Sequence, residues 1–249
     1  GLSLTPTDML KGYLLSKIKD EEQRRDAGAT FKKRVQELRD LGKSAAGDGI
    51  KAWLRSQHAQ NIRERSRGSK PGDFDLIGTQ FHRWVRDHLK QLGLKSSENF
   101  IAFIEKDFTF YTGEFIRLRK AAETFTEGLE QVFYNAQSNF TLQYPVILAP
   151  LNPEDSEEEK SSKIRITSTY LDILIARRIW NWKRFGYSSM QYAMFLLMHE
   201  IRGKDIPDLV EILRSKLDSE SKVIIASGSQ FQKSGQNARH VHNILARIT

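Results

Sequence analysis

Several basic side chains lie close together in one predicted loop, where they could contact phosphate groups. The loop has the sequence RERSRGSKPGD, and its cations are Arg63, Arg65, Arg67 and Lys70. Residues 51–70 carry six Lys and Arg against one acidic residue, Glu64. Such side chains bind phosphate oxygens, and each contact adds a salt-dependent contribution that does not depend on base sequence. The loop is therefore a candidate nucleic-acid contact, and the alternative is a solvated charged surface.

A second basic cluster flanks a long apolar stretch near Trp180 and Trp182. Residues 161–190 carry six Lys and Arg against one acidic residue. The candidates for phosphate contact in this cluster are Arg177, Lys183 and Arg184. We expect them to bind DNA only if they are exposed and not paired inside the protein. Because the two clusters are distant in sequence, they form one surface only if the fold brings them together.

Arg178 has a different expected role. On a helix it projects from the middle of an apolar face, where a buried guanidinium without a partner costs several kcal/mol. We therefore predict a structural ion pair for Arg178, or a bond to a carbonyl group, and not a functional site.

The segment VIIASGSQFQKSG resembles a phosphate-binding loop, because an apolar run precedes glycines and a Lys-Ser pair. That motif needs Gly directly before the Lys, whereas Gln232 precedes Lys233 here. We predict a connection between elements and no nucleotide site.

The histidines offer no metal-binding pattern. His240 and His242 are two residues apart, which on a helix turns them about 200° from each other. His82 and His88 are six apart, and the sequence has no HExxH motif and no cysteine. We expect no metal and no other cofactor, and we find no catalytic motif, so whether the chain is an enzyme stays undecided at this point.

One long helix is expected to organise the fold, from Lys163 to Phe185. At about 100° per residue, one broad apolar face contains Ile164, Leu171, Leu174, Ile175, Ile179, Trp182 and Phe185. A second stripe, on roughly the opposite side, contains Ile166, Ile173 and Trp180. A helix with two apolar faces must be contacted on both sides. The pattern predicts a buried central helix.

The rest of the chain is predicted to be helices separated by polar breaks. The first begins at Thr5 and Pro6 with a capping box to Asp8. Further helices are expected at about 21–41, 50–62, 74–92, 97–104, 115–132, 142–151, 190–201, 206–217 and 236–248, with residues 222–227 the one stretch that could form a strand. The fold class is all-α, an irregular bundle around the central helix. It is one domain over residues 1–249, or two subdomains, 1–150 and 163–249, joined by an acidic loop at 152–162.

Composition limits the class of protein. The 249 residues include 39 Lys and Arg against 31 Asp and Glu, a net charge of +8, which favours an acidic partner such as DNA. The absence of cysteine is typical of a reducing cytoplasm. No apolar run approaches the roughly 20 residues that cross a bilayer, so we expect no membrane partner. Because the first residue is Gly1, we expect a fragment of a longer protein.

Three motifs resemble the GmrSD-type modification-dependent restriction endonucleases and their phage-defence relatives. The opening GLSLTPTDMLKGYLL is similar to that family's L-x-x-x-D-L-L-K-N-x-L-L helix, with Met9 in place of one Leu and Gly12 in place of Asn. TYLDILIARR is similar to its Y-L-x-x-L-L-x-R-R helix, and HVHNILARI to a later helix.

The resemblance implies a place in a larger bacterial protein. In the family, a ParB-like N-terminal domain hydrolyses nucleotides and a C-terminal HNH domain cuts DNA. Neither catalytic motif occurs here, so the expected role is a non-catalytic helical connector that joins the two domains and could itself contact DNA. The alternative is a stand-alone helical domain that binds another protein. The sequence leaves the oligomeric state open.

Overall fold

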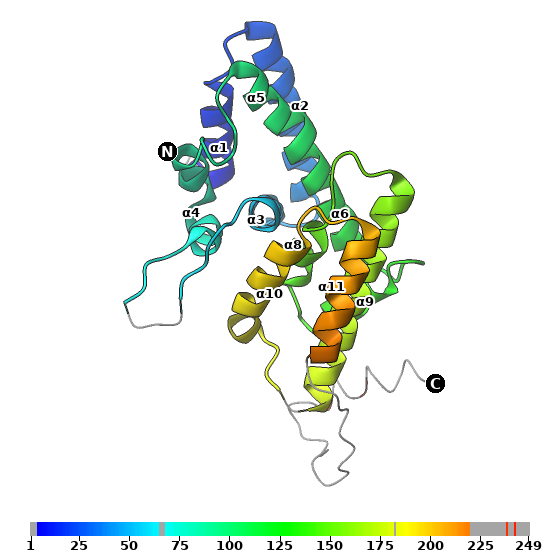
Figure 1. Cartoon of the computed structure of the whole chain (residues 1–249). Coiled ribbons are helices and arrows are strands. Elements are labelled where there is room, and N and C mark those ends of the chain that lie inside the picture. The colour runs from blue at the N-terminus through cyan, green and yellow to red at the C-terminus, as the bar shows by residue number, and fades with distance from the viewer. Residues whose placement is uncertain (1–3, 65–67, 182, 220–237, 239–241, 243–249) are drawn as a thin grey trace. The chain divides into compact units, whose positions relative to one another are not determined.

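The computed structural model describes residues 4–64, 68–181 and 183–219, together with Ala238 and His242. These residues form helices joined by turns, with no strand among them, which confirms the all-α prediction. Of the described residues, 71% are helical. Within the described ranges, no helix combines the length and apolar character needed to cross a membrane. The chain divides into two compact units, residues 1–119 and residues 120–249 (Figure 1).

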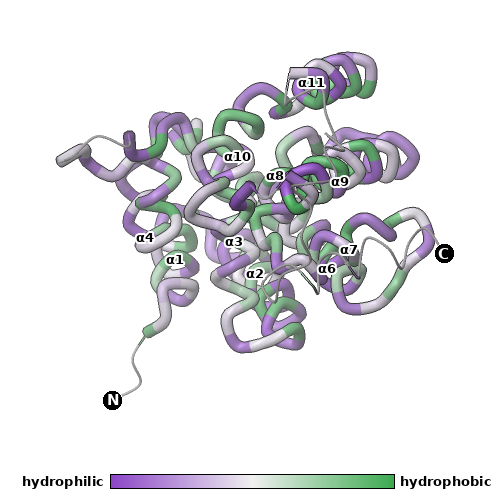
Figure 2. Tube along the Cα trace, turned by 90° about the horizontal axis from the view of Figure 1, so that it is seen from below, coloured by the Kyte–Doolittle hydropathy of each residue, from purple (hydrophilic) through white to green (hydrophobic). Residues whose placement is uncertain are grey.

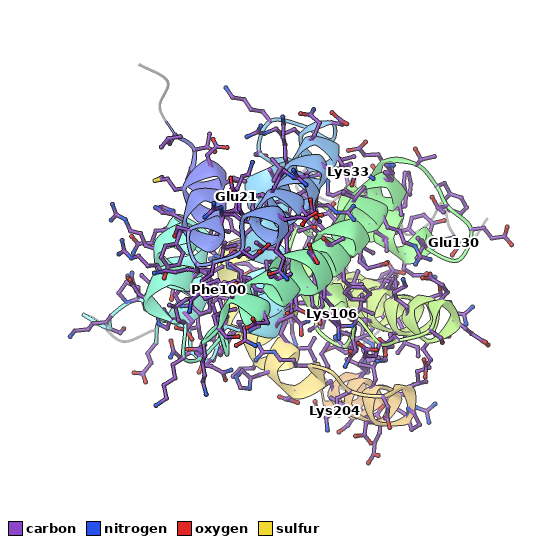
Figure 3. The ribbon with its side chains drawn as sticks, turned by 90° about the horizontal axis from the view of Figure 1, so that it is seen from above. Glu21, Lys33, Phe100, Lys106, Glu130 and Lys204 are labelled. Carbon is purple, nitrogen blue, oxygen red and sulfur yellow. The ribbon has the colours of Figure 1, made fainter. Side chains whose placement is uncertain are left out.

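The first unit consists of six helices and the beginning of a seventh. They are α1 (Pro6–Leu15), α2 (Glu21–Arg39), α3 (Ala45–Gln57), α4 (Asp73–Asp87), α5 (Ser97–Ala102), the π-helix η1 (Phe103–Phe108) and α6 (Thr109–Glu123). The expected capping box starts α1, since the Thr5 hydroxyl accepts from the Asp8 amide at 3.2 Å. Helix α1 packs on both α2 and α4. Figure 3 shows α2, which carries Glu21 and Lys33, beside the continuous helix that carries Phe100 and Lys106.

An aromatic core holds the first unit together. The Phe31 and Phe108 rings stack with centroids 4.4 Å apart, and the Trp53 ring lies 4.7 Å from that of Phe103. Gly49 allows this packing, because a Cβ there would lie 3.0 Å from the Phe115 ring. Most of the break that we expected between the helices at 21–41 and 50–62 is part of α3, which begins at Ala45.

The second unit is built around one long helix. It contains α7 (Glu130–Gln137), α8 (Gln143–Leu148), α9 (Glu157–Trp180), α10 (Tyr187–Ile201) and α11 (Ile206–Ser219). Helix α9 packs against α7, α8 and α11, and α10 packs against α8 and α11. The predicted first apolar face of α9 is buried at Ile164, Leu171, Leu174, Ile175 and Ile179. The prediction of a central buried helix is confirmed.

The boundaries of α9 differ from the predicted 163–185. The helix begins at Glu157 because Ser156 caps it, with the Ser156 hydroxyl bound to the Glu159 amide at 3.2 Å and the Glu159 carboxylate bound to the Ser156 amide at 2.9 Å. Acidic side chains in a first turn also suit the positive end of the helix dipole. The end of the expected acidic loop is therefore helix. Helix α9 ends at Trp180, where Asn181 caps it by donating to the Arg177 carbonyl.

Several other predicted helices were wrong in extent, and those expected at 50–62 and 74–92 end at Gln57 and Asp87. The helix expected at 115–132 stops at Glu123, since Phe125 is 56% exposed and Gly128 takes a left-handed φ of 78° before α7 begins. Conversely, the helix expected at 97–104 continues through η1 into α6 without a break. The possible strand at 222–227, the loop around Gln232 and nearly all of the last predicted helix lie outside the described residues.

A buried ion pair fixes the acidic segment 152–162 inside the second unit. The Lys163 ammonium group is 5% exposed and donates to the two Asp155 carboxylate oxygens at 2.7 and 2.9 Å. It also donates to the Pro150 carbonyl at 3.1 Å. The part of this segment that precedes α9, residues 152–156, is thus held against that helix.

Candidate nucleic-acid interface

The basic loop predicted from the sequence joins α3 to α4, and its two ends are bonded to each other. We define it as residues 58–72. The Gln60 amide donates to the Asp73 carboxylate at 2.9 Å, and the Asp73 amide donates to the Asn61 side-chain oxygen at 2.7 Å. The Asp75 carboxylate accepts from the amides of Arg63 and Gly72, at 2.8 and 3.0 Å. The first turn of α4 therefore closes the loop at its base.

Asp73 is the buried centre of this attachment, with 5% of its surface exposed. Its carboxylate also accepts from the Trp84 ring nitrogen at 3.0 Å and from the Gln91 amide group at 3.3 Å. His88 stacks on Trp84 with ring centroids 4.7 Å apart and places its Nε2 3.7 Å from Asp73. A buried carboxylate is tolerated when donors surround it in this way. The loop is thus fixed to the core of the first unit.

Gly72 is required where the two ends of the loop meet. A Cβ at this position would lie 2.6 Å from the Asn61 side-chain oxygen and 2.8 Å from the backbone of Asn61 and Ile62. Any other residue would have to displace the segment of the loop at Asn61 and Ile62.

The predicted cations of the loop are exposed where the structure describes them. Arg63 and Lys70 are both exposed, while Arg65 and Arg67 lie outside the described residues. Because the bonds at the base use backbone amides and carboxylates, the side chains of Arg63 and Lys70 are not consumed by them. The loop offers cations at its surface from a fixed base.

A second basic surface lies on α1 and α4 and was not predicted. We call the residues Tyr13, Lys17, Arg83 and Arg86 the α1/α4 patch. Lys17 lies 5.3 Å from the centre of the Tyr13 ring. Arg83 and Arg86 are exposed and three positions apart, so they share one side of α4. Asp87 binds Arg86 at 2.9 Å and neutralises part of the charge.

Two pKa shifts show the electrostatic environment of this patch. Burial raises the pKa of Tyr13, with Arg86 opposing the shift and Asp87 adding to it. Burial lowers the pKa of His82, and the positive charges of Arg83 and Arg86 lower it further. The Tyr13 hydroxyl therefore stays neutral, and the His82 ring favours its neutral form beside two arginines.

Helix α1 has cations on its other flank as well. A shallow groove of about 910 Å³ separates it from α2, lined by Lys11, Leu15, Glu21, Glu22, Arg24, Arg25, Gly28, Ala29 and Lys32. Four of these side chains are cationic and two are acidic. Gly28 lets the helices approach, because a Cβ there would lie 3.2 Å from the Leu15 methyl carbon. Positive charge thus lies on both sides of α1.

The two units differ greatly in charge. Residues 1–119 contain 23 Lys and Arg against 16 Asp and Glu, a net +7. Residues 120–249 contain 16 against 15, a net +1. Nearly all of the excess positive charge of the chain therefore belongs to the first unit.

The cluster expected near the end of α9 lies in the second unit, and one of its arginines is paired. The Arg177 guanidinium donates to the Leu217 carbonyl in the last turn of α11. Cations are favourable at that end of a helix, so Arg177 joins α9 to α11. Lys183 and Arg184 are exposed. The half-buried Arg178 donates twice to the Arg184 carbonyl, at 2.9 and 2.8 Å.

The α1/α4 patch carried a signal in the sequence. Phe81, Trp84 and Val85 are buried, while Arg83 and Arg86 are exposed, which is the alternation of an amphipathic helix. A search for dense runs of charge finds the loop at 63–70 but misses cations that share a helix face. The contribution of α1 depends on tertiary packing and has no local signal.

Two of the three motifs that carry the family resemblance fall on described helices. GLSLTPTDMLKGYLL supplies α1, and TYLDILIARR lies within α9. HVHNILARI lies outside the described residues except for His242. The resemblance rests on these motifs, since no protein-family model, no curated protein and no solved structure matches the chain.

Proposed function

We propose that the chain is a non-catalytic helical connector of a GmrSD-like bacterial defence nuclease, and that its first unit binds the phosphate backbone of DNA. In this role it joins a nucleotide-hydrolysing N-terminal domain to a C-terminal HNH nuclease. The observation that carries the DNA contact is the basic loop at 58–72, whose exposed cations sit on a base fixed by Asp73 and Asp75.

Phosphate binding suits the chemistry of this unit. Its exposed cations are spread over the loop, α1 and α4, and backbone binding needs several such contacts but no base-specific geometry. The Tyr13 ring lies among the cations of the α1/α4 patch, as aromatic side chains do in many single-strand binding sites. The expected binding is weak, independent of sequence and strongly dependent on salt.

A loop with a fixed base loses less conformational freedom on binding than a loop that is free at both ends, and this favours binding. The loop spans 58–72, but its ends are bonded to each other and to α4. The Arg63 amide is itself bonded to Asp75, and Lys70 lies two residues before Gly72, whose amide is bonded to the same carboxylate. The base of the loop is therefore in place before DNA binds.

The alternative function, a stand-alone domain that binds another protein, would need an open apolar surface. A groove between α9 and α11 is such a surface. Its geometry points to an occupant within the chain itself, as argued below.

The test is a salt titration of DNA binding by the 249-residue chain, with a labelled 20-base-pair duplex and fluorescence anisotropy. Changing Arg63, Arg65, Arg67 and Lys70 together to alanine should lower the log–log salt slope by about 2 to 4. Changing Lys17 and Arg83 to alanine should lower it by about 1 to 2. Changing Arg177, Lys183 and Arg184 should have a smaller effect, because Arg177 is paired with Leu217.

A control removes two charges from the second unit, as many as the Lys17 and Arg83 variant removes from the first. Lys204 and Lys216 are paired with Asp208 and Glu200 at 3.3 and 2.6 Å, so changing both to alanine lowers the net charge by two without touching the proposed surface. Absence of binding by the wild-type chain at low salt, or equal slopes for the control and the loop variant, would exclude the DNA contact. The connector role would then be tested separately, by the presence of the two catalytic domains in the complete gene product.

A further inference from the structure

An apolar groove lies between α9 and α11 in the second unit, and most of the apolar side chains that line it are only half-buried. Its volume is about 430 Å³. The apolar side chains that line it are Ile166, Ile173, Val210, Leu213 and Leu217. Leu213 is buried, but the other four are half-buried. The two helices lie side by side in Figures 1 and 2, so the groove follows their length.

One wall of the groove is formed by the second apolar stripe of the central helix. Ile166 and Ile173 are seven residues apart on α9, and Val210 and Leu217 are seven apart on α11. Each pair spans about 10 Å at 1.5 Å per residue. Two parallel apolar rows of that length form the kind of surface that takes the apolar face of a third helix.

We infer that the occupant of this groove is the C-terminal segment of the same chain, residues 236–248. Its apolar residues are Val241, Ile244, Leu245 and Ile248, with the i, i+3, i+4, i+7 spacing of an amphipathic helix. They also span seven residues, which matches the length of both walls. The two described residues of this segment, Ala238 and His242, are helical, and Ala238 extends the apolar row by one turn.

The connection between α11 and this segment is long enough. Helix α11 ends at Ser219, two residues after Leu217 in the groove wall. Residues 220–235 then lead to the segment and can extend about 50 Å, at about 3.3 Å per residue. A return along the 14 residues of α11 needs about 21 Å.

The charges of the segment fit this orientation. Arg165 and Arg214 lie at the edges of the groove, so cations on the inserted face would be repelled. On a helix, Arg239 lies on the side opposite the apolar row that begins at Val241, and Arg247 lies on its flank, about 110° away. They would face solvent when the apolar row enters the groove. The assignment does not depend on DNA binding by the first unit.

The absence of cysteine from the chain allows a direct test by disulfide formation. One cysteine replaces Thr169, which lines the groove, and another replaces Leu245 in the 249-residue chain. Two controls move one cysteine at a time to an opposite face, either Ser215→Cys on α11 or Asn243→Cys in the segment. Rates under mild oxidation are followed on non-reducing gels, and the bonded peptides are identified by mass spectrometry.

If the segment occupies the groove, the Thr169–Leu245 cysteine pair should form an intramolecular disulfide at least about tenfold faster than either control, because docking raises the local concentration of the two thiols. Equal rates in all three variants would overturn the inference. A disulfide found only in dimers would also overturn it and would assign the groove to a second copy of the chain.

A second measurement needs no cysteine. Ile244→Asp should lower the melting temperature and increase the binding of a hydrophobic dye, because it places a charge in the groove and releases the segment. Asn243→Asp adds the same charge on the opposite face and should leave both quantities near the wild-type values. Identical behaviour of the two variants would contradict the inference even if a cysteine variant failed to fold.

Discussion

Each unit uses one buried charge to hold a polar segment, and the two solutions are opposite in sign. In the first unit the Asp73 carboxylate fixes a basic loop, and its close partners are neutral donors, the Gln60 amide and the Trp84 ring nitrogen. In the second unit the Lys163 ammonium group fixes an acidic segment, and its main partner is the Asp155 carboxylate. A buried charge thus anchors a segment of opposite charge in each unit.

The comparison shows why the exposed charge differs between the units. Asp73 binds the loop through backbone and ring N–H groups, so the loop cations Arg63 and Lys70 stay exposed. Lys163 consumes a carboxylate of the segment that it holds, and Arg177 of the same helix binds a helix end. Lys163 and Arg177 are thus bound inside the second unit, whereas Arg63 and Lys70 of the first unit stay exposed.

The largest expected effect follows from breaking the ion pair of the second unit. Lys163→Ala leaves the Asp155 carboxylate, 11% exposed, without its cation, so the free energy of unfolding should fall by about 3 to 5 kcal/mol. Urea denaturation measures this. The surface pair of Lys216 and Glu200 is the control, and Lys216→Ala should cost at most about 1 kcal/mol.

A double variant separates the charge from the packing. Replacing Lys163 by Met and Asp155 by Leu removes both charges, and much of the lost stability should return, since apolar replacement of a buried pair is often neutral. A loss below about 1 kcal/mol for Lys163→Ala would mean that the pair contributes little in this unit.

Removal of the anchor in the first unit should cost somewhat less. Asp73→Ala removes the acceptor of the buried Trp84 ring nitrogen and of the part-buried bond from the Gln60 amide, and losing both bonds should cost about 2 to 4 kcal/mol. The loop should also become a faster substrate for trypsin at Arg63, which Glu64 follows, whereas Lys70 precedes Pro71 and is resistant. Asp87→Ala, which removes a surface carboxylate from the same helix, should change neither quantity noticeably.

The third prediction concerns Gly72 at the base of the loop. Gly72→Ala forces a Cβ to within 2.8 Å of the Asn61 backbone, and such overpacking costs about 1 to 3 kcal/mol. Gly12 is the matched control, because a Cβ at that position in α1 meets nothing within 4 Å. Gly12→Ala should therefore raise the stability by about 0.5 to 1 kcal/mol through its better helix propensity. Shifts of the same sign in both variants would contradict this reading of the loop base.

The sequence was informative wherever the determinant is local. The Thr5 capping box, the short helix α8 and the main apolar face of α9 all depend on residues a few positions apart, and all are present in the structure. The Ser156 to Glu159 box was equally local. We missed it because a run of acidic residues suggested a loop, although acidic residues are favourable in the first turn of a helix.

The remaining features depend on residues that are distant in sequence. Asp73 precedes a helix like many capping residues, and only the fold shows that Gln60 and Gln91 converge on it. The pairing of Arg177 requires the end of α11, 40 residues away. The α1/α4 patch combines a helix-face pattern, which is readable, with the packing of α1 on α4, which is not.

The smallest expected effect is a pH dependence that distinguishes the two units. The pKa of His82 is lowered by burial, Arg83 and Arg86, and the pKa of His199 in the second unit is lowered by burial and Arg202. A lowered folded-state pKa means that the unfolded chain takes up the proton first. Stability is therefore fully present above about pH 6.5 and declines as the pH falls below it. His82→Gln and His199→Gln should each make this decline shallower in urea denaturation between pH 7 and 5.5.

The two histidines should differ in their effect on DNA binding, because of the two only His82 lies beside the arginines of the α1/α4 patch. Its protonation adds a cation to that surface, so the DNA affinity of the wild-type chain should rise as the pH falls from 7 to 5.5 at fixed salt. His82→Gln should remove part of that rise, whereas His199→Gln should leave it unchanged. An equal loss in both variants would mean that the rise follows the total charge of the chain, and the α1/α4 patch would then have no special part in binding.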